Sequence, residues 1–189
     1  MNEDYNKVID SIRQVLIEKN KRYGNAALSP LNVFYKGDAQ TSICIRLDDK
    51  LSRIKNSDKL RKNDMFDLLG YCLLLHVDYL TRQEYFHDEA SFETRLNFVF
   101  QIIQDIRKYT DKHIMKPLNY DAKEEFSFKG FSKTEDDNVG VIRNLNGICS
   151  EIKDDKGGWY TYVMNPHLIL FLIEYFVENN ITDFTDLID

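Results

Sequence analysis

A nearly uninterrupted apolar stretch between residues 65 and 77 constrains the fold of this chain more than any other feature. As a helix it would be apolar on almost every side, and such a helix is stable only when other elements cover it. Asp67, near its start, is therefore expected to be at least half-buried or to face a polar cleft. Asp64 and Asp67 are one helical turn apart and share a face of this helix.

A second helix is predicted immediately before the buried one. Its apolar residues recur at intervals of four, four and three, which makes one stripe: Ile43, Leu47, Leu51 and Ile54. Charged side chains lie off that stripe, among them Arg46, Asp49 and Arg53. The two helices can therefore face each other, with carboxylates near the line where they meet.

These carboxylates suggest a metal site, because Mg²⁺ prefers several carboxylate oxygens. Asp49 would meet Asp64 and Asp67 across the two helices, and Mn²⁺ is an alternative ion. A basic segment between the helices would suit phosphates: Lys50, Arg53, Lys55, Lys59, Arg61 and Lys62.

A purely structural interpretation of the same residues stays open. Asn63 or Asp64 would cap the buried helix, and Asp67 would favour its N-terminus. Asp49 would pair with Arg53, four residues later, on the surface.

Three segments carry a resemblance to a known family: KNKRYGNAALSPLNVF, IRLDDKLSRIKN and DLLGYCLLL. Over roughly residues 5–82 the chain resembles the MazG-like all-α nucleotide pyrophosphohydrolases, in particular the phage and prophage dATP/dGTP diphosphohydrolase-like, nucleotide-modification-associated proteins. The resemblance implies a helical bundle that forms a homodimer or a larger homo-oligomer. It also implies Mg²⁺-dependent hydrolysis of a purine (deoxy)nucleoside triphosphate to the monophosphate and pyrophosphate.

The resemblance assigns roles to individual residues. Asp49 and Asp67, helped by Asp64, would bind the metal and form the catalytic group. The phosphate and nucleotide contacts would be Tyr23, Asn25, Arg46, Lys50 and Arg53.

The sequence departs from the family at Arg46, which stands where the first glutamate of an acidic pair is expected. This departure motivates an alternative function. In that alternative the chain is a non-catalytic phage-encoded binding protein that retains the helical scaffold, and its long C-terminal extension recognises a host protein or a nucleotide signal.

The first helix is predicted over residues 3–21, with Val8, Ile9, Ile12, Val15 and Leu16 inward, and Gly24 ends it by adopting the left-handed conformation. The loop over residues 25–39 is unusually apolar. We expect it to pack back onto the bundle through Leu28, Leu31, Val33 and Phe34, as a lid or an oligomer contact.

The second half of the chain has a different pattern. A helix with a packing seam is predicted from Phe92, Leu96, Val99, Ile103 and Ile106, with Asp88 or Ser91 as its cap. Alternation in residues 148–152 and 159–164 around a glycine-containing turn predicts a β-hairpin. A final buried helix begins at Pro166.

The predicted fold is therefore mainly α. A MazG-like helical domain spans residues 1–84, and an α+β extension with one hairpin spans residues 85–189.

Composition and charge narrow the function classes. The net charge of −6 argues against a general affinity for nucleic acid. No apolar run is long enough to span a membrane, and the acidic N-terminus lacks a signal core. The chain has three widely spaced cysteines: Cys44, Cys72 and Cys149. An odd number at such spacing indicates a protein of the reducing cytoplasm rather than a disulfide framework.

Overall fold

The structure, a computed structural model, describes residues 3–34, 36–57, 60–87, 89–112 and 166–188. This part of the chain is helical and contains no strand, so the prediction of a mainly α fold is confirmed for it. The elements are α1 (Glu3–Tyr23), α2 (Ala39–Lys55), α3 (Lys62–Arg82), α4 (Phe92–Lys112), α7 (Pro166–Glu178) and the 3₁₀ helix η3 (Thr185–Leu187).

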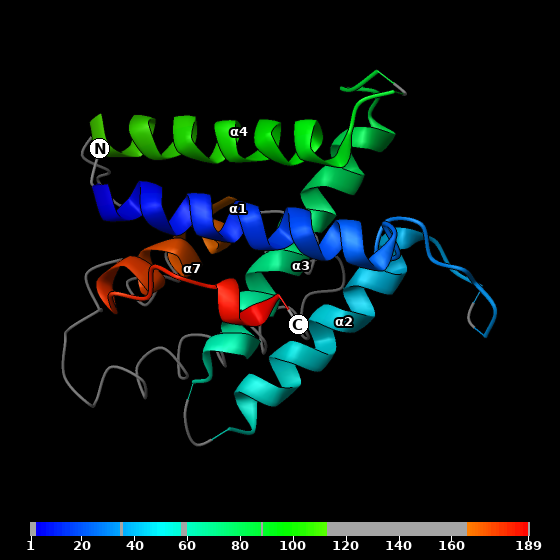
Figure 1. Cartoon of the computed structure of the whole chain (residues 1–189), viewed down its shortest axis with the longest axis horizontal. Coiled ribbons are helices and arrows are strands. Elements are labelled where there is room, and N and C mark those ends of the chain that lie inside the picture. Colours follow the sequence, from blue (N-terminus) through cyan, green and yellow to red (C-terminus); the bar gives the residue numbers. More distant parts are fainter. Residues whose placement is uncertain (1–2, 35, 58–59, 88, 113–165, 189) are drawn as a thin grey trace, which may run out of the picture.

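Helix α3 lies at the centre of the arrangement, where it contacts α2, α4 and α7 (Figure 1). Helix α1 lies alongside α4 and also contacts α7 and η3. The five α-helices within the described residues all contribute to one hydrophobic core, and α3 is buried along most of its length, as its apolar composition predicts.

The apolar stripes predicted for α1 and α4 are confirmed. The predicted inward residues of α1 are all buried, as are the central seam residues Leu96, Val99 and Ile103 of α4. The seam packs within the chain, against α1, α3 and α7. Ser91 caps α4, because its Oγ accepts a hydrogen bond from the backbone N–H of Thr94 at 3.1 Å.

Helix α1 ends where the sequence predicts a reversal. Gly24 has a φ of +58°, and Asn25 follows with a φ of +62°. The reversal brings the loop back onto the helix end, where Asn20 Nδ2 donates to Asn25 Oδ1 at 3.0 Å. Helix α2 then begins after Asp38, whose carboxylate accepts hydrogen bonds from Thr41.

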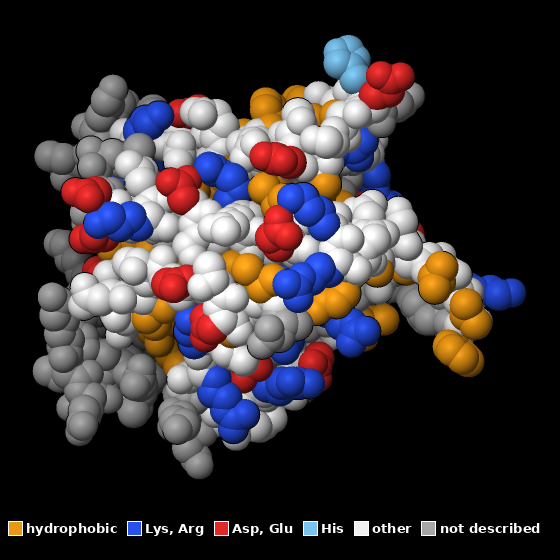
Figure 2. Space-filling model, viewed as in Figure 1, with side chains coloured by type: hydrophobic (Ala, Val, Ile, Leu, Met, Phe, Trp, Pro, Cys, Tyr) orange, Lys and Arg blue, Asp and Glu red, His pale blue; other side chains and the backbone are white. Residues whose placement is uncertain are grey.

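The expectation that the whole apolar loop packs onto the bundle is wrong. Leu28 does pack against the core, but Leu31, Val33 and Phe34 are 91%, 69% and 102% exposed. The segment beyond Pro30 leads away from the body, and hydrophobic side chains gather on this projection (Figures 1 and 2). We call Leu31, Val33 and Phe34 the apolar arm.

The predicted hairpin, and the residues around Trp159, lie outside the described residues. Helices from both sides of the predicted boundary near residue 85 share the core, and the division into domains at that point stays a prediction. Among the described helices, none has the length and apolar character needed to cross a membrane.

Candidate ligand pocket and its lysine–aspartate cluster

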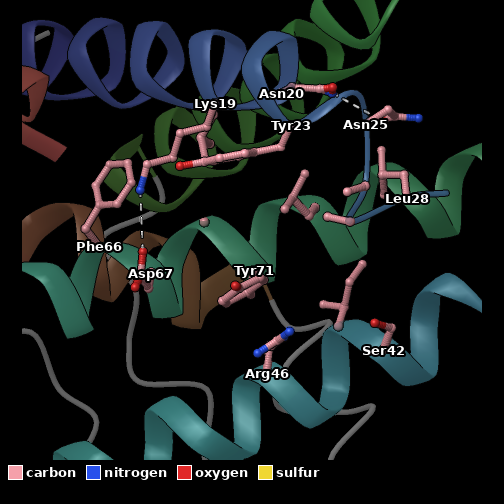
Figure 3. Close-up of a pocket in the computed structure, with 16 residues that line it drawn as sticks. Lys19, Asn20, Tyr23, Asn25, Leu28, Ser42, Arg46, Phe66, Asp67 and Tyr71 are labelled. Carbon is pink, nitrogen blue, oxygen red and sulfur yellow. Dashed lines mark hydrogen bonds and ion pairs between the residues drawn. The ribbon is translucent and has the colours of Figure 1, made fainter. Parts of the chain in front are cut away.

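A pocket of about 380 Å³ opens between the end of α1, the loop after it, the first half of α2 and the middle of α3. Figure 3 shows Lys19 and Tyr23 reaching from α1 towards Asp67 and Tyr71 of α3, while Asn20 points to Asn25 in the loop. The size of the pocket and its mixture of apolar and polar walls are typical of small-molecule sites. The other lining residues are Leu16, Asn25, Ala26, Ala27, Leu28, Ser42, Ile43, Arg46, Phe66, Gly70 and Leu74.

Gly70 of α3 makes room for the Leu16 side chain of α1 beside the pocket. A Cβ atom at this position would lie 3.2 Å from Cδ2 of Leu16, closer than ordinary van der Waals contact. A larger side chain would push Leu16 away and intrude on the pocket wall.

Arg46 supplies a positive charge at the pocket. Its side chain is exposed, and it forms no ion pair with any residue that the structure describes. The charge of Arg46 also acts on Tyr71, because it favours the deprotonated phenolate and so lowers the pKa of that side chain. Burial, with a smaller contribution from Asp67, raises the pKa of Tyr71 despite the opposing charges of Arg46 and Lys50. The phenol therefore stays protonated at neutral pH and can donate a hydrogen bond.

A cluster of four charged residues adjoins the pocket and joins three helices. Lys50 Nζ of α2 lies 2.7 Å from Asp67 Oδ2 and 3.7 Å from Asp64 Oδ1, both on α3. Lys19 Nζ of α1 lies 3.8 Å from Asp67 Oδ1. We call these residues the lysine–aspartate cluster. It pairs two ammonium groups with two carboxylates, and Asp67 is the member shared by both lysines.

The predicted site residues therefore fall into three groups: those that line the pocket, those in the adjoining cluster, and those outside both. Tyr23, Asn25, Arg46 and Asp67 line one pocket, and Asp64 and Lys50 lie next to it in the cluster. Asp49 and Arg53 do not line the pocket.

Instead, Asp49 Oδ2 pairs with Arg53 Nη2 at 3.1 Å on the exposed face of α2, as the structural interpretation predicts. The capping role for Asn63 or Asp64 is wrong. Helix α3 begins at Lys62, with Arg61 as the N-cap, and Asp64 faces Lys50 instead.

The predicted Mg²⁺ can be tested against this donor set. Within the described residues no group of three or more histidine, cysteine or acidic side chains is arranged to hold a metal. Asp64 and Asp67 face the same point, but the ammonium of Lys50 already lies there. A divalent ion about 4 Å from that ammonium would be repelled by roughly 8 kcal/mol at an effective dielectric constant of about 20. With Lys50 in place the residues do not fit a divalent ion.

Some pocket residues had no predicted role. Lys19 and Asn20 lie in the last turns of α1, and Lys19 Nζ is also 5.3 Å from the centre of the Phe66 ring. Helical spacing could have indicated that Lys19 lies at the pocket, because it is four residues before Tyr23 and shares a face of α1 with it.

Comparison of the chain with protein-family models, with curated protein sequences and with solved structures finds no match. The geometry of the pocket therefore carries the functional argument.

Proposed function

We propose that the pocket binds a nucleotide, and that binding rather than hydrolysis is the function of this site. The observation that carries the proposal is Arg46, a guanidinium that lines the pocket without a carboxylate partner among the described residues. Arginine presents a planar set of donors that matches two phosphate oxygens at once. A phosphate group is therefore the ligand chemistry that Arg46 recognises best.

The other walls suit the nucleoside part of such a ligand. Tyr23 and Tyr71 offer aromatic surface from opposite sides, and Leu28 and Leu74 add apolar contact. Aromatic side chains stack on bases of any sequence.

Amide groups at the loop end favour a purine with an exocyclic amino group. Asn20, which lines the pocket, uses its Nδ2 to donate to Asn25, and its Oδ1 is the side-chain atom that can accept a hydrogen bond. An adenine amino group is a suitable donor for that oxygen.

Mg²⁺-dependent pyrophosphohydrolysis of a purine (deoxy)nucleoside triphosphate is the second candidate. Asp67 favours it, because this carboxylate lines the pocket and has Asp64 one turn away. Hydrolysis by this route requires a divalent ion to displace the ammonium of Lys50. The lysine–aspartate cluster therefore favours binding without turnover, as in the alternative suggested by the sequence.

Self-association is proposed as well, as a homodimer or a larger homo-oligomer. It is supported by the apolar arm, whose three side chains are largely exposed to solvent within a single copy of the described chain. A contiguous exposed apolar group of this kind is typical of interaction sites.

Two further parts of the proposal come from the sequence. A role in phage or prophage nucleotide metabolism follows from the resemblance, and a host protein partner for the extension follows from its length. A reducing cytoplasm is the proposed compartment, and it is supported by Cys44 and Cys72, which are free thiols.

Two measurements on the full chain test the function. Calorimetric titration with a panel of purine and pyrimidine nucleotides, in EDTA, is expected to show saturable binding that is strongest for purines. If no nucleotide binds, the proposal is wrong. In parallel, pyrophosphate release with Mg²⁺ that disappears in Asp67→Asn would establish the second candidate instead.

A further inference from the structure

The position between Asp64 and Asp67 is filled by a side chain of the protein itself. We propose that the Lys50 ammonium is the resident cation of this carboxylate pair, so that the site works without a divalent metal. Lys50 then acts as a positioning residue, which holds Asp67 at the wall of the pocket.

The geometry supports one shared cation position. Asp64 and Asp67 project from the same face of α3, and Lys50 Nζ lies within 3.7 Å of one and 2.7 Å of the other. A metal bound by both carboxylates would have to take the same place, since its oxygen ligands would be these same atoms.

Burial makes the lysine difficult to displace. The side chains of Lys50 and Asp64 are only 12% and 10% exposed. A buried ammonium that loses its carboxylates keeps its desolvation cost without the compensating attraction. A divalent ion would have to move Lys50 out of this setting before it could bind.

The charge balance of the cluster also argues against a bound divalent ion. Lys19 lies on the other side of Asp67, so two positive side chains already balance Asp64 and Asp67. Replacing Lys50 with a neutral side chain removes one of them and leaves the carboxylate pair facing an empty position. The variant Lys50→Gln should therefore acquire a divalent cation site that the natural protein lacks.

Mn²⁺ titration of the protein alone, followed by electron paramagnetic resonance, tests this without any nucleotide. The unmodified protein and Lys50→Arg are expected to show no tightly bound Mn²⁺. Lys50→Gln should bind one Mn²⁺ at least about tenfold more tightly than the unmodified protein, because the repelling charge is gone. Lys21→Gln is the matched control, since it removes a lysine that pairs with Glu18 on the exposed face of α1.

Two outcomes would overturn the inference. One is tight Mn²⁺ binding by the unmodified protein that is lost in Asp67→Asn. The other is a folded Lys50→Gln protein, judged by circular dichroism, with no gain in Mn²⁺ binding. If Lys50→Gln does not fold, the unmodified protein decides alone: absence of tightly bound Mn²⁺ supports the inference, and its presence overturns it. Because no nucleotide is used, failure here is separate from failure of the proposed binding function.

Discussion

The ammonium of Lys50 on α2 lies 2.7 Å from the carboxylate of Asp67 on α3, and that carboxylate also lines the pocket. This ion pair connects the packing of two helices to the wall of a candidate binding site. Substitution of either residue should therefore change both the stability of the protein and its affinity for a ligand.

Replacing Asp67 with asparagine should destabilise the protein by about 1 to 2 kcal/mol, because Lys50 is largely buried and loses its nearest partner. The control is Asp49→Asn, which removes an exposed partner of Arg53 and should change stability by less than about 0.5 kcal/mol. Urea denaturation measures both. Equal effects of the two substitutions would show that the cluster has no special energetic role.

Asp38 should stabilise the start of α2 through its hydrogen bonds to Thr41. Asp38→Ala is expected to lose about 1 kcal/mol, whereas Asp38→Asn should keep most of the capping energy. Thermal denaturation of both variants checks this. The prediction is wrong if the asparagine variant is as unstable as the alanine variant.

The same cap predicts a pH dependence. Hydrogen bonds from Thr41, and then Arg82, lower the pKa of Asp38 to about 2 from an ordinary value of 3.8. Its contribution to stability should be complete above pH 3.8 and should be lost as the pH falls towards 2. Asp38→Ala should therefore lose less stability than the natural chain over that interval. An identical acid dependence in the two proteins would contradict this.

Both described cysteines should react slowly with alkylating reagents at neutral pH. Burial raises the pKa of Cys72 to about 12 and that of Cys44 to about 11, so both thiols stay protonated. Alkylation of the native protein, followed by peptide mass mapping, should leave Cys72 unmodified until denaturant is added. Rapid modification of Cys72 in the native state would show that α3 opens readily.

The apolar arm should mediate self-association. Replacing Leu31 and Phe34 with serine is expected to shift the protein towards monomer in sedimentation velocity experiments, because the apolar area that drives association is removed. Tyr85→Ser is a suitable control, since Tyr85 is also exposed but lies outside the arm. A purely monomeric natural protein, or an oligomer that survives the double substitution, would refute this role for the arm.

Much of the fold could be predicted because burial repeats with the helical period. The inward residues of α1 and the seam of α4 follow from spacing alone, since one face of each helix must be covered. The apolar arm shows the limit of that argument. The sequence shows that Leu31 and Phe34 are apolar. It does not show whether the surface that would cover them belongs to the same chain or to another molecule.

The site was only partly predictable for a similar reason. Periodicity places Asp49, Asp64 and Asp67 on faces of their own helices. It does not fix the rotation of α2 against α3, which is what turns Lys50 towards the two aspartates of α3 and leaves Asp49 with Arg53. The start of α3 at Lys62 likewise depended on backbone geometry, because Arg61 caps it without a side-chain hydrogen bond.

Calorimetric titration of Arg46→Gln with the tightest-binding purine nucleotide, in EDTA, tests whether this guanidinium binds the phosphate group. If it does, the affinity of this variant should be at least about tenfold weaker than that of the natural protein, because hydrogen bonds to a charged group are lost. The control is Arg22→Gln, because Arg22 is also an exposed arginine but lies on α1 and does not line the pocket; this variant should bind as the natural protein does. Unchanged affinity in Arg46→Gln would contradict the assignment of this pocket as the nucleotide site.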